Sequence, residues 1–235
     1  MRLLVLAGGF GTRLQSVVAD VPKALAPIGN VPFLYLQIEH WISQDLRSFV
    51  FLLHHQADLM IQFLEYEKDK LLKDCEVTWV IEPDPMDTGG AVAYTISELK
   101  LTHNFLLTNA DTWLGTGIKA IAQSTAPSMA VLRVNDVSRY GQVGFDDQLK
   151  VTAFIEKSNT QGSGWINAGL YYLNVEIFQN WDGRPFSLER VLFTQLAGEG
   201  ALSAVALQTD FIDIGIPEDY RKYFNWIKSG KKNEL

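Results

Sequence analysis

The sequence has one cysteine, so an internal disulfide is excluded. We expect Cys75 to be an inert residue beside a strand, as suits a reducing cytoplasm. The four histidines show no metal-ligand spacing, and the adjacent pair His54 and His55 has no cysteine or carboxylate partner nearby in the sequence. No apolar stretch approaches the roughly 20 residues of a membrane-spanning helix, and the run after Arg2 is too short for a signal peptide. The sequence therefore predicts a cytoplasmic protein without a membrane partner.

The sequence also lacks a long basic run and has a formal net charge of −7, which argues against non-specific nucleic-acid binding. It contains no internal repeat and no low-complexity segment. A chain of 235 residues with 47% apolar residues can bury a sizeable core. We therefore expect a single domain over residues 1–235, rather than two separate domains, and a small-molecule partner.

The most informative stretch is residues 3–23, LLVLAGGFGTRLQSVVADVPK. Its first four residues are apolar without alternation, which is typical of a strand covered on both faces. Three glycines then leave the backbone open, so its amide groups can approach an anion. On these glycines alone, an ordinary strand-to-helix turn is an equal alternative. Arg13 and Lys23 add two cations and favour a triphosphate site.

Two better-known glycine motifs do not fit this stretch. A P-loop needs Gly-Lys five residues after its first glycine, and Arg13 stands there instead. A dinucleotide fingerprint needs a third glycine at the position of Leu14. A nicotinamide-dependent oxidoreductase is therefore a remote alternative.

Buried strands alternate with amphipathic helices in the first half of the chain, a pattern typical of a doubly wound α/β protein. The expected strands are 3–6, 48–53, 77–81 and 104–108, and the expected helices are 33–42, 58–67 and 91–99. Prolines, glycines and carboxylates predict a loop over residues 82–91. The second half is rich in strands, at 129–134, 142–145, 151–155, 165–173 and 201–207. There Ser187 is the expected N-cap of a helix that runs to about residue 196, and a terminal helix begins at Pro217.

Asp111 and Asp213 both follow apolar strands, so both belong at the carboxyl edge of the sheet, where α/β folds bind ligands. Two aspartates suffice for Mg²⁺ when a nucleotide and water complete its octahedron. Taken alone, each is more often a turn or cap residue. Trp113 and Trp165 flank candidate site residues, and a sugar pocket and the core are equal alternatives for them.

Ala7 to Arg13, together with the pair Pro22-Lys23, resembles the signature of the sugar-1-phosphate nucleotidylyltransferases. The similarity continues to the C-terminus, and the whole chain most resembles the heptose-1-phosphate and mannose-1-phosphate guanylyltransferases. The resemblance implies a doubly wound mixed sheet of the Rossmann-like, glycosyltransferase-A-like nucleotidyltransferase type, with a β-rich half that binds the sugar. It also implies an enzyme of nucleotide-sugar biosynthesis that transfers a nucleotidyl group from a nucleoside triphosphate to a sugar 1-phosphate and releases pyrophosphate.

The resemblance further implies which residues form the site. The catalytic candidates are Arg13, Lys23 and Asp111, and the ligands of Mg²⁺ are Asp111 and Asp213. The nucleotide candidates are Ala7, Gly8, Gly9, Gly11, Thr12, Arg13, Glu82, Asp87 and Thr88. The sugar-phosphate candidates are Asn109, Gly141, Glu156, Lys157, Asn167 and Gly169.

Two positions depart from the family pattern, because Ala110 and Asp87 stand where glycine is common. Ionised carboxylates only accept hydrogen bonds, and guanine offers adjacent N–H donors, so Glu82 and Asp87 favour GTP. If backbone groups recognise the base instead, a UTP- or dTTP-using enzyme remains an alternative. A non-catalytic NDP-sugar-binding protein is the alternative from another class. A homodimer is compatible with the sequence.

Overall fold

The structure is a computed structural model that describes residues 1–230, except 15, 19 and 156–161. The chain forms two compact units. Unit 1 comprises Met1–Pro83, Asn109–Gly115 and Asp210–Leu235, and unit 2 comprises Asp84–Thr108 and Thr116–Thr209. The single-domain expectation stays a prediction, because two compact units of one chain can belong to one domain.

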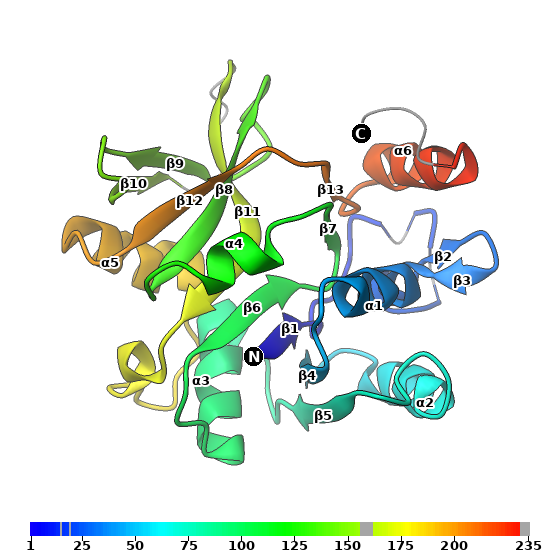
Figure 1. The fold of residues 1–235 in the computed structure, drawn as a ribbon. Coiled ribbons are helices and arrows are strands. Elements are labelled where there is room, and N and C mark those ends of the chain that lie inside the picture. The colour runs from blue at the N-terminus through cyan, green and yellow to red at the C-terminus, as the bar shows by residue number, and fades with distance from the viewer. Residues whose placement is uncertain (15, 19, 156–161, 231–235) are drawn as a thin grey trace. The chain divides into compact units, whose positions relative to one another are not determined.

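Unit 1 contains a parallel sheet in the order β1 (Arg2–Leu6), β4 (Ser48–Leu53) and β5 (Glu76–Ile81), with α1 (Phe33–Ser43) and α2 (Ala57–Glu67) between the strands in sequence (Figure 1). The register pairs Leu4 with Val50, and Val50 with Thr78. The central residues of β1 are fully buried, as their unbroken apolar run predicts. The carboxyl ends of these strands therefore lead into the glycine-rich loop, His54 and Glu82.

Short elements complete unit 1 around a second apolar cluster. They are η1 (Lys23–Leu25), β2 (Pro27–Ile28), β3 (Val31–Pro32), β7 (Thr112–Leu114), β13 (Phe211–Asp213) and α6 (Pro217–Lys228). β7 and β13 pair antiparallel, with Asp213 opposite Thr112. Helix α6 begins at Pro217 as expected, with acidic residues in its first turn and Lys228 in its last, which complements the helix dipole. Its Tyr223 and Trp226 are buried against Phe33 and Trp113.

Unit 2 is the strand-rich half, and its sheet is mixed. The order is β10 (Val151–Ile155), β9 (Gln142–Phe145), β11 (Gly164–Leu173) and β6 (Phe105–Asn109), all antiparallel neighbours. Strand β8 (Ser128–Val134) pairs with β11, and β12 (Ser203–Leu207) pairs parallel with β8. The register along β11 shifts between Asn167 and Tyr171, where Gly169 adopts a positive φ of 71°. The fold class is therefore mixed α/β, as expected.

The helices of unit 2 differ from the expectation in two places. Helix α3 (Asp87–Leu99) begins four residues earlier than predicted, inside the stretch expected to be a loop. The N-cap Ser187 is confirmed, but the following turn is a π-helix, η3 (Leu188–Phe193), and α5 (Thr194–Gly198) continues through Gly198. The remaining elements are α4 (Ile118–Ala122) and η2 (Val175–Phe178).

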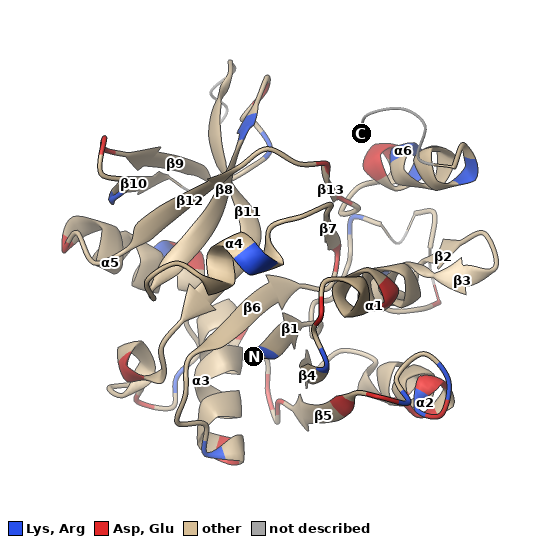
Figure 2. Cartoon of the chain, viewed as in Figure 1, with Lys and Arg blue, Asp and Glu red and all other residues tan. Residues whose placement is uncertain are grey.

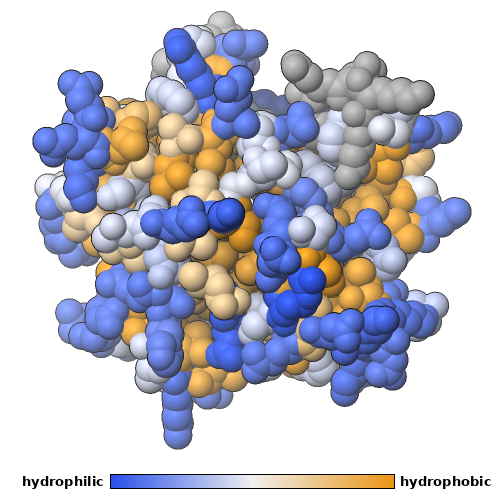
Figure 3. Space-filling model, viewed as in Figure 1, coloured by the Kyte–Doolittle hydropathy of each residue, from blue (hydrophilic) through white to orange (hydrophobic). Residues whose placement is uncertain are grey.

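Lysine and arginine are interspersed with aspartate and glutamate along the described chain (Figure 2). Both hydrophilic and apolar residues reach the surface on the side drawn in space-filling view (Figure 3). Among the described residues, no helix combines the length and apolarity needed to cross a bilayer.

Candidate active site

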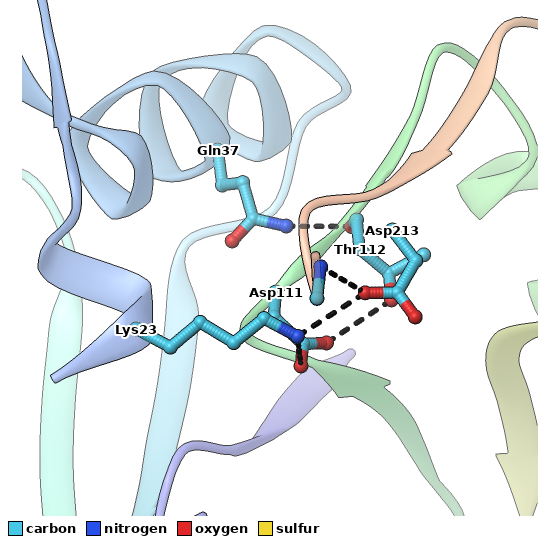
Figure 4. A network of polar contacts seen from close by, with 6 residues as sticks. Lys23, Gln37, Asp111, Thr112 and Asp213 are labelled. Atoms are coloured by element: carbon cyan, nitrogen blue, oxygen red, sulfur yellow. Dashed lines mark hydrogen bonds and ion pairs between the residues drawn. The ribbon is translucent and has the colours of Figure 1, made fainter. Parts of the chain in front are cut away.

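Three charged side chains from distant parts of the sequence meet in unit 1 (Figure 4). The Nζ atom of Lys23 lies 2.5 Å from Asp111 Oδ2 and 3.2 Å from Asp213 Oδ1. Lys23 is the first residue of η1, Asp111 lies in the turn before β7, and Asp213 ends β13. The structure thus brings together the lysine and both aspartates that the sequence singled out.

Backbone and polar contacts fix the two carboxylates of this cluster. Thr112 Oγ1 donates to Asp111 Oδ1 at 3.2 Å, and the Gly215 amide donates to Asp213 Oδ1 at 2.7 Å. The buried Gln37 amide on α1 donates to the Thr112 carbonyl at 2.6 Å, which holds β7 in place (Figure 4). These bonds leave the carboxylates little freedom to turn away from Lys23.

Gly215 leaves room for this cluster. A Cβ atom there would lie 2.7 Å from Asp213 Oδ1 and 2.8 Å from Lys23 Nζ. Both distances are shorter than any ordinary non-bonded contact of a methyl group, so a larger residue would displace the lysine or the aspartate.

The charges stabilise one another. Burial lowers the pKa of Lys23, but the negative charges of Asp111 and Asp213 outweigh burial and leave that pKa raised. Burial likewise raises the pKa of Asp111, but the Lys23 charge and hydrogen bonds leave it lowered. Lys23 and Asp111 are therefore both charged at neutral pH, and the Lys23 side chain is only 12% exposed.

Two carboxylates directed at a single cation are a fitting donor set for a divalent metal, because hard cations such as Mg²⁺ take oxygen ligands and keep several waters. The ammonium group of Lys23 supplies the positive charge between them in this structure. Within the described residues there is no cluster of three or more histidine, cysteine or acidic side chains that could hold a metal. Asp111 and Asp213 therefore suit a metal that receives its other ligands from substrate and water.

The glycine-rich loop follows β1 in the same unit. The Ala7 amide donates to the Leu52 carbonyl, and the Gly8 carbonyl accepts from His55. A Cβ atom on Gly8 would lie 3.1 Å from Glu82 Oε1, so Gly8 lets the buried Glu82 carboxylate lie against the loop. The nucleotide candidates at the ends of β1 and β5 are therefore neighbours.

Beyond Gly8 the loop turns toward Lys23. Gly11 has a φ of 61°, a left-handed conformation that favours glycine, and a Cβ there would lie 3.2 Å from Lys23 Cβ. Among the described residues, no hydrogen bond is made by the amides of Gly9, Thr12 or Arg13. The structure thus presents backbone donors beside the lysine, as an anion site requires.

In unit 2, Asp87 and Thr88 lie in the first turn of α3. The expectation of a loop was wrong, because contacts with a segment about 100 residues later stabilise this turn. The amides of Gly89 and Gly90 donate to the Phe186 carbonyl at 2.8 and 3.1 Å. A Cβ on Gly89 would lie 2.2 Å from the Phe186 ring, so the glycines expected to break the helix allow it to pack.

The sugar-phosphate candidates of unit 2 surround the irregular part of β11. The Asn167 amide donates to the Gly141 carbonyl at 2.9 Å, and Asn167 Oδ1 accepts from the Gly169 amide at 3.0 Å. Thr108 Oγ1 donates to the Gly169 carbonyl. Three of the candidates are therefore joined by hydrogen bonds. Glu156 and Lys157 lie outside the described residues.

The two tryptophans that flank candidate site residues differ in their burial. Trp113 is 3% exposed and packs against Tyr223 and Trp226, with the His40 ring stacked on it at 4.4 Å. It is a core residue, so the alternative that it lines a sugar pocket is wrong. Trp165 is partly buried against Phe145, with ring centroids 5.2 Å apart.

The remaining sugar-phosphate candidate, Asn109, ends β6 and belongs to unit 1.

Three polar residues that support these candidates were not predicted from the sequence, namely Gln37, Tyr171 and Glu189. Gln37 interrupts the apolar face of α1, and a buried amide on such a face is the one local signal that points to a role. Glu189 bonds to Thr88 across 101 positions, a pairing that no local pattern encodes.

The chain matches the Nucleotidyl transferase family over residues 2–229. It is 32% identical over 222 residues to the D-glycero-alpha-D-manno-heptose 1-phosphate guanylyltransferase of Campylobacter jejuni, and the match covers 94% of this chain and 97% of that protein. It is 31% identical over 228 residues to the probable mannose-1-phosphate guanylyltransferase 1 of Oryza sativa. That match covers 94% of this chain and 63% of the rice protein, so the chain spans less than two thirds of that relative.

Two solved structures are similar to this chain. HddC from Yersinia pseudotuberculosis, complexed with GMP-PN, is 33% identical with a TM-score of 0.83, covering 96% of this chain and 99% of HddC. A putative glucose-1-phosphate thymidylyltransferase from Bacillus anthracis shares the fold at 15% identity, with a TM-score of 0.81 and coverage of 100% and 97%. Because the family match extends over residues 2–229, and the Campylobacter jejuni relative is 32% identical over 97% of its length, the chain belongs to the Nucleotidyl transferase family.

Proposed function

We propose that this protein transfers a guanylyl group from GTP to a sugar 1-phosphate, with heptose or mannose 1-phosphate as the acceptor, and releases pyrophosphate. The observation that carries the proposal is the cluster of Lys23, Asp111 and Asp213 beside the glycine-rich loop. A non-catalytic NDP-sugar-binding protein has no need of two carboxylates that converge on one cation. The guanylyltransferase names of the relatives favour GTP over UTP or dTTP.

The reaction is an in-line displacement. A phosphate oxygen of the sugar 1-phosphate attacks the α-phosphorus of GTP, the bond from that phosphorus to the bridging oxygen breaks, and pyrophosphate leaves with the electron pair. The protein needs no covalent intermediate, so its contributions are alignment and charge neutralisation. The loop amides and Arg13 are suited to the leaving pyrophosphate, and Lys23 and Lys157 to the reacting phosphates.

Asp111 and Asp213 would hold a divalent metal, which we propose to be Mg²⁺. Such a metal neutralises phosphate charge when it is bound. The remaining contacts are proposed for the residues expected from the sequence. Glu82, Asp87 and Thr88 contact the nucleotide. The sugar phosphate contacts Asn109, Gly141, Glu156, Asn167 and Gly169. A cytoplasmic location and a homodimer stay predictions.

Pyrophosphate release, measured over a matrix of nucleoside triphosphates and sugar 1-phosphates with Mg²⁺, tests the proposal. We expect the largest kcat/KM for GTP with a heptose or mannose 1-phosphate. Release that is faster with UTP or dTTP would keep the enzyme class and change the base. No release with any pair, accompanied by binding of an NDP-sugar, would identify a binding protein instead.

A further inference from the structure

Glu189 on the π-helix η3 accepts two hydroxyl hydrogen bonds on the same oxygen. Thr88 Oγ1 donates to Glu189 Oε2 at 2.8 Å, and Ser187 Oγ donates to it at 3.0 Å. Thr88 is a nucleotide candidate, whereas neither Ser187 nor Glu189 was one. A half-buried carboxylate thus holds the side chain of a residue in the proposed site.

The Thr88 hydroxyl is committed to this contact. Its oxygen also accepts the Leu188 amide at 2.9 Å, so the hydroxyl both donates and accepts within the protein. The amide of Thr88 donates to Asp87 Oδ1 at 2.7 Å, and the next two amides donate to the Phe186 carbonyl. In the first turn of α3, three consecutive amides and the Thr88 hydroxyl therefore donate to protein atoms, and a nucleotide would meet a surface that is already fixed.

Asp87 is held by the same segment. Its φ of 56° is left-handed, a conformation that aspartate tolerates better than most residues. One carboxylate oxygen accepts the Thr88 amide, and the other accepts Arg190 Nη2 at 2.9 Å. Arg190 and Glu189 are adjacent on η3, so one turn of helix contacts both nucleotide candidates of α3.

The helix that carries Glu189 is also anchored through Phe193. Phe193 packs on Tyr171 with ring centroids 4.9 Å apart, and on Phe154 at 6.0 Å. Asn167 Nδ2 donates to the buried Tyr171 hydroxyl at 2.7 Å. π-Helical turns are rare and frequently occur at functional sites, since they redirect side chains within a helix. These contacts give Glu189 a rigid support.

We propose that Glu189 is a positioning residue that holds Thr88, and with it the first turn of α3, in the geometry that binds the nucleotide. The proposal rests on the proposed function, because it takes Thr88 and Asp87 to be nucleotide contacts. Glu189 acts only through Thr88 and Ser187 and does not touch the substrate. Its removal should therefore affect nucleotide binding more than use of the sugar phosphate.

The test compares Glu189→Ala and Glu189→Gln with the parent protein by calorimetric titration with GTP and Mg²⁺ in the absence of a sugar phosphate. We expect Glu189→Ala to weaken GTP binding about tenfold. Glu189→Gln should stay within about threefold of the parent, because its amide oxygen can still accept both hydroxyl groups. The matched control is Glu199→Ala, which removes an exposed carboxylate that contacts Gln195 of the same unit and should leave binding unchanged.

Steady-state kinetics supply a readout that a general loss of stability would not give. The KM for GTP should rise in Glu189→Ala, whereas the KM for the sugar phosphate should change by less than about twofold. Thr88→Val removes the same hydrogen bond from the other side, so the double variant should be no worse than the poorer single variant. Thr88→Val also decides the question if Glu189→Ala fails to fold.

Three outcomes would overturn the positioning role if the parent is active. The first is unchanged GTP binding in a folded Glu189→Ala, or in Thr88→Val if only that variant folds. The others are an equal loss of GTP binding in Glu189→Gln and Glu189→Ala, and full additivity of the losses in Glu189→Ala and Thr88→Val. A parent protein that releases no pyrophosphate with any substrate pair would instead overturn the proposed function, and this proposal with it.

Discussion

The ion cluster of unit 1 and the first turn of α3 in unit 2 satisfy their polar groups in opposite ways. In unit 1, Lys23 is the cation that both Asp111 and Asp213 contact, and all three charges are held at distances of 2.5 to 3.2 Å. At α3, hydroxyl groups, amides and carboxylates are distributed over several partners, with Glu189 accepting from Thr88 and Ser187.

The difference indicates different tasks. A carboxylate pair that shares one cation can exchange it, or add a second, without unfolding the strands that carry it, so the cluster is suited to chemistry that moves charge. A turn whose amides and side chains are largely bonded to the protein keeps its shape when a ligand arrives, so α3 is suited to binding that ligand in one geometry. Substitutions should accordingly affect turnover in the first region and nucleotide binding in the second.

The largest effect should come from Asp111→Asn and Asp213→Asn. Each removes a charge that we propose to hold Mg²⁺, so kcat at saturating Mg²⁺ should fall by about 1,000-fold, or about 4 kcal/mol of barrier. Asp69→Asn, an exposed carboxylate in the same unit, is the matched control. Turnover within about threefold of the parent would show that the substituted aspartate is not a metal ligand.

Arg13→Ala should lower kcat by about 100-fold, because negative charge develops on the departing pyrophosphate only as the bond breaks. Arg13 is exposed, so the folded state should retain its stability. Initial rates at varied GTP would separate the two possible roles. A raised KM for GTP with unchanged kcat would mean that Arg13 binds the ground state and the transition state equally.

Gly215→Ala should damage the cluster without removing any charge. The new methyl group would lie less than 3 Å from both Lys23 Nζ and Asp213 Oδ1, so one of them must move. We expect kcat to fall by roughly tenfold, less than the roughly 100-fold that a misplacement of about 1 Å can cost, because the ends of both side chains can adjust. Gly198→Ala is the matched control, because a Cβ there has no neighbour within 4 Å. Equal activity of the two variants would contradict the close geometry.

The two regions also differ in how far the sequence predicts them. The sequence predicted that Asp111 and Asp213 lie together at one edge of the sheet. Their shared contact with Lys23 confirms that they lie together, but Asp213 ends β13, which pairs antiparallel with β7 in a separate two-stranded sheet. The α3 turn was predicted wrongly, because the proline, glycine and aspartate composition of residues 82–91 is typical of a loop. Tertiary contacts with Phe186 and Arg190 override that local tendency.

Local patterns likewise could not place Trp113 or identify Glu189. Trp113 is next to Thr112 of the cluster, yet its ring packs into the core because His40 and two α6 aromatic residues surround it. Ser187 was correctly predicted as a helix cap. The sequence offers no sign, however, that Glu189 accepts a hydrogen bond from Thr88. Pairings over such separations are decided by packing.

The smallest effect, and the sharpest test of the comparison, concerns base preference. We expect Glu82→Gln to reduce the GTP preference about tenfold, since one good hydrogen-bonded pair discriminates by roughly 1 to 3 kcal/mol. The Glu82 carboxylate lies against Gly8 of the glycine-rich loop.

Asp87→Gly should change the preference less, because both carboxylate oxygens of Asp87 already accept protein donors. It should also leave stability within about 1 kcal/mol of the parent, since glycine relieves the left-handed φ while the exposed pair with Arg190 is lost. The measurement is kcat/KM for GTP relative to UTP and dTTP, with thermal denaturation alongside. A larger loss of preference in Asp87→Gly than in Glu82→Gln would mean that the α3 turn contacts the base directly, and that its closed network is part of recognition rather than only its support.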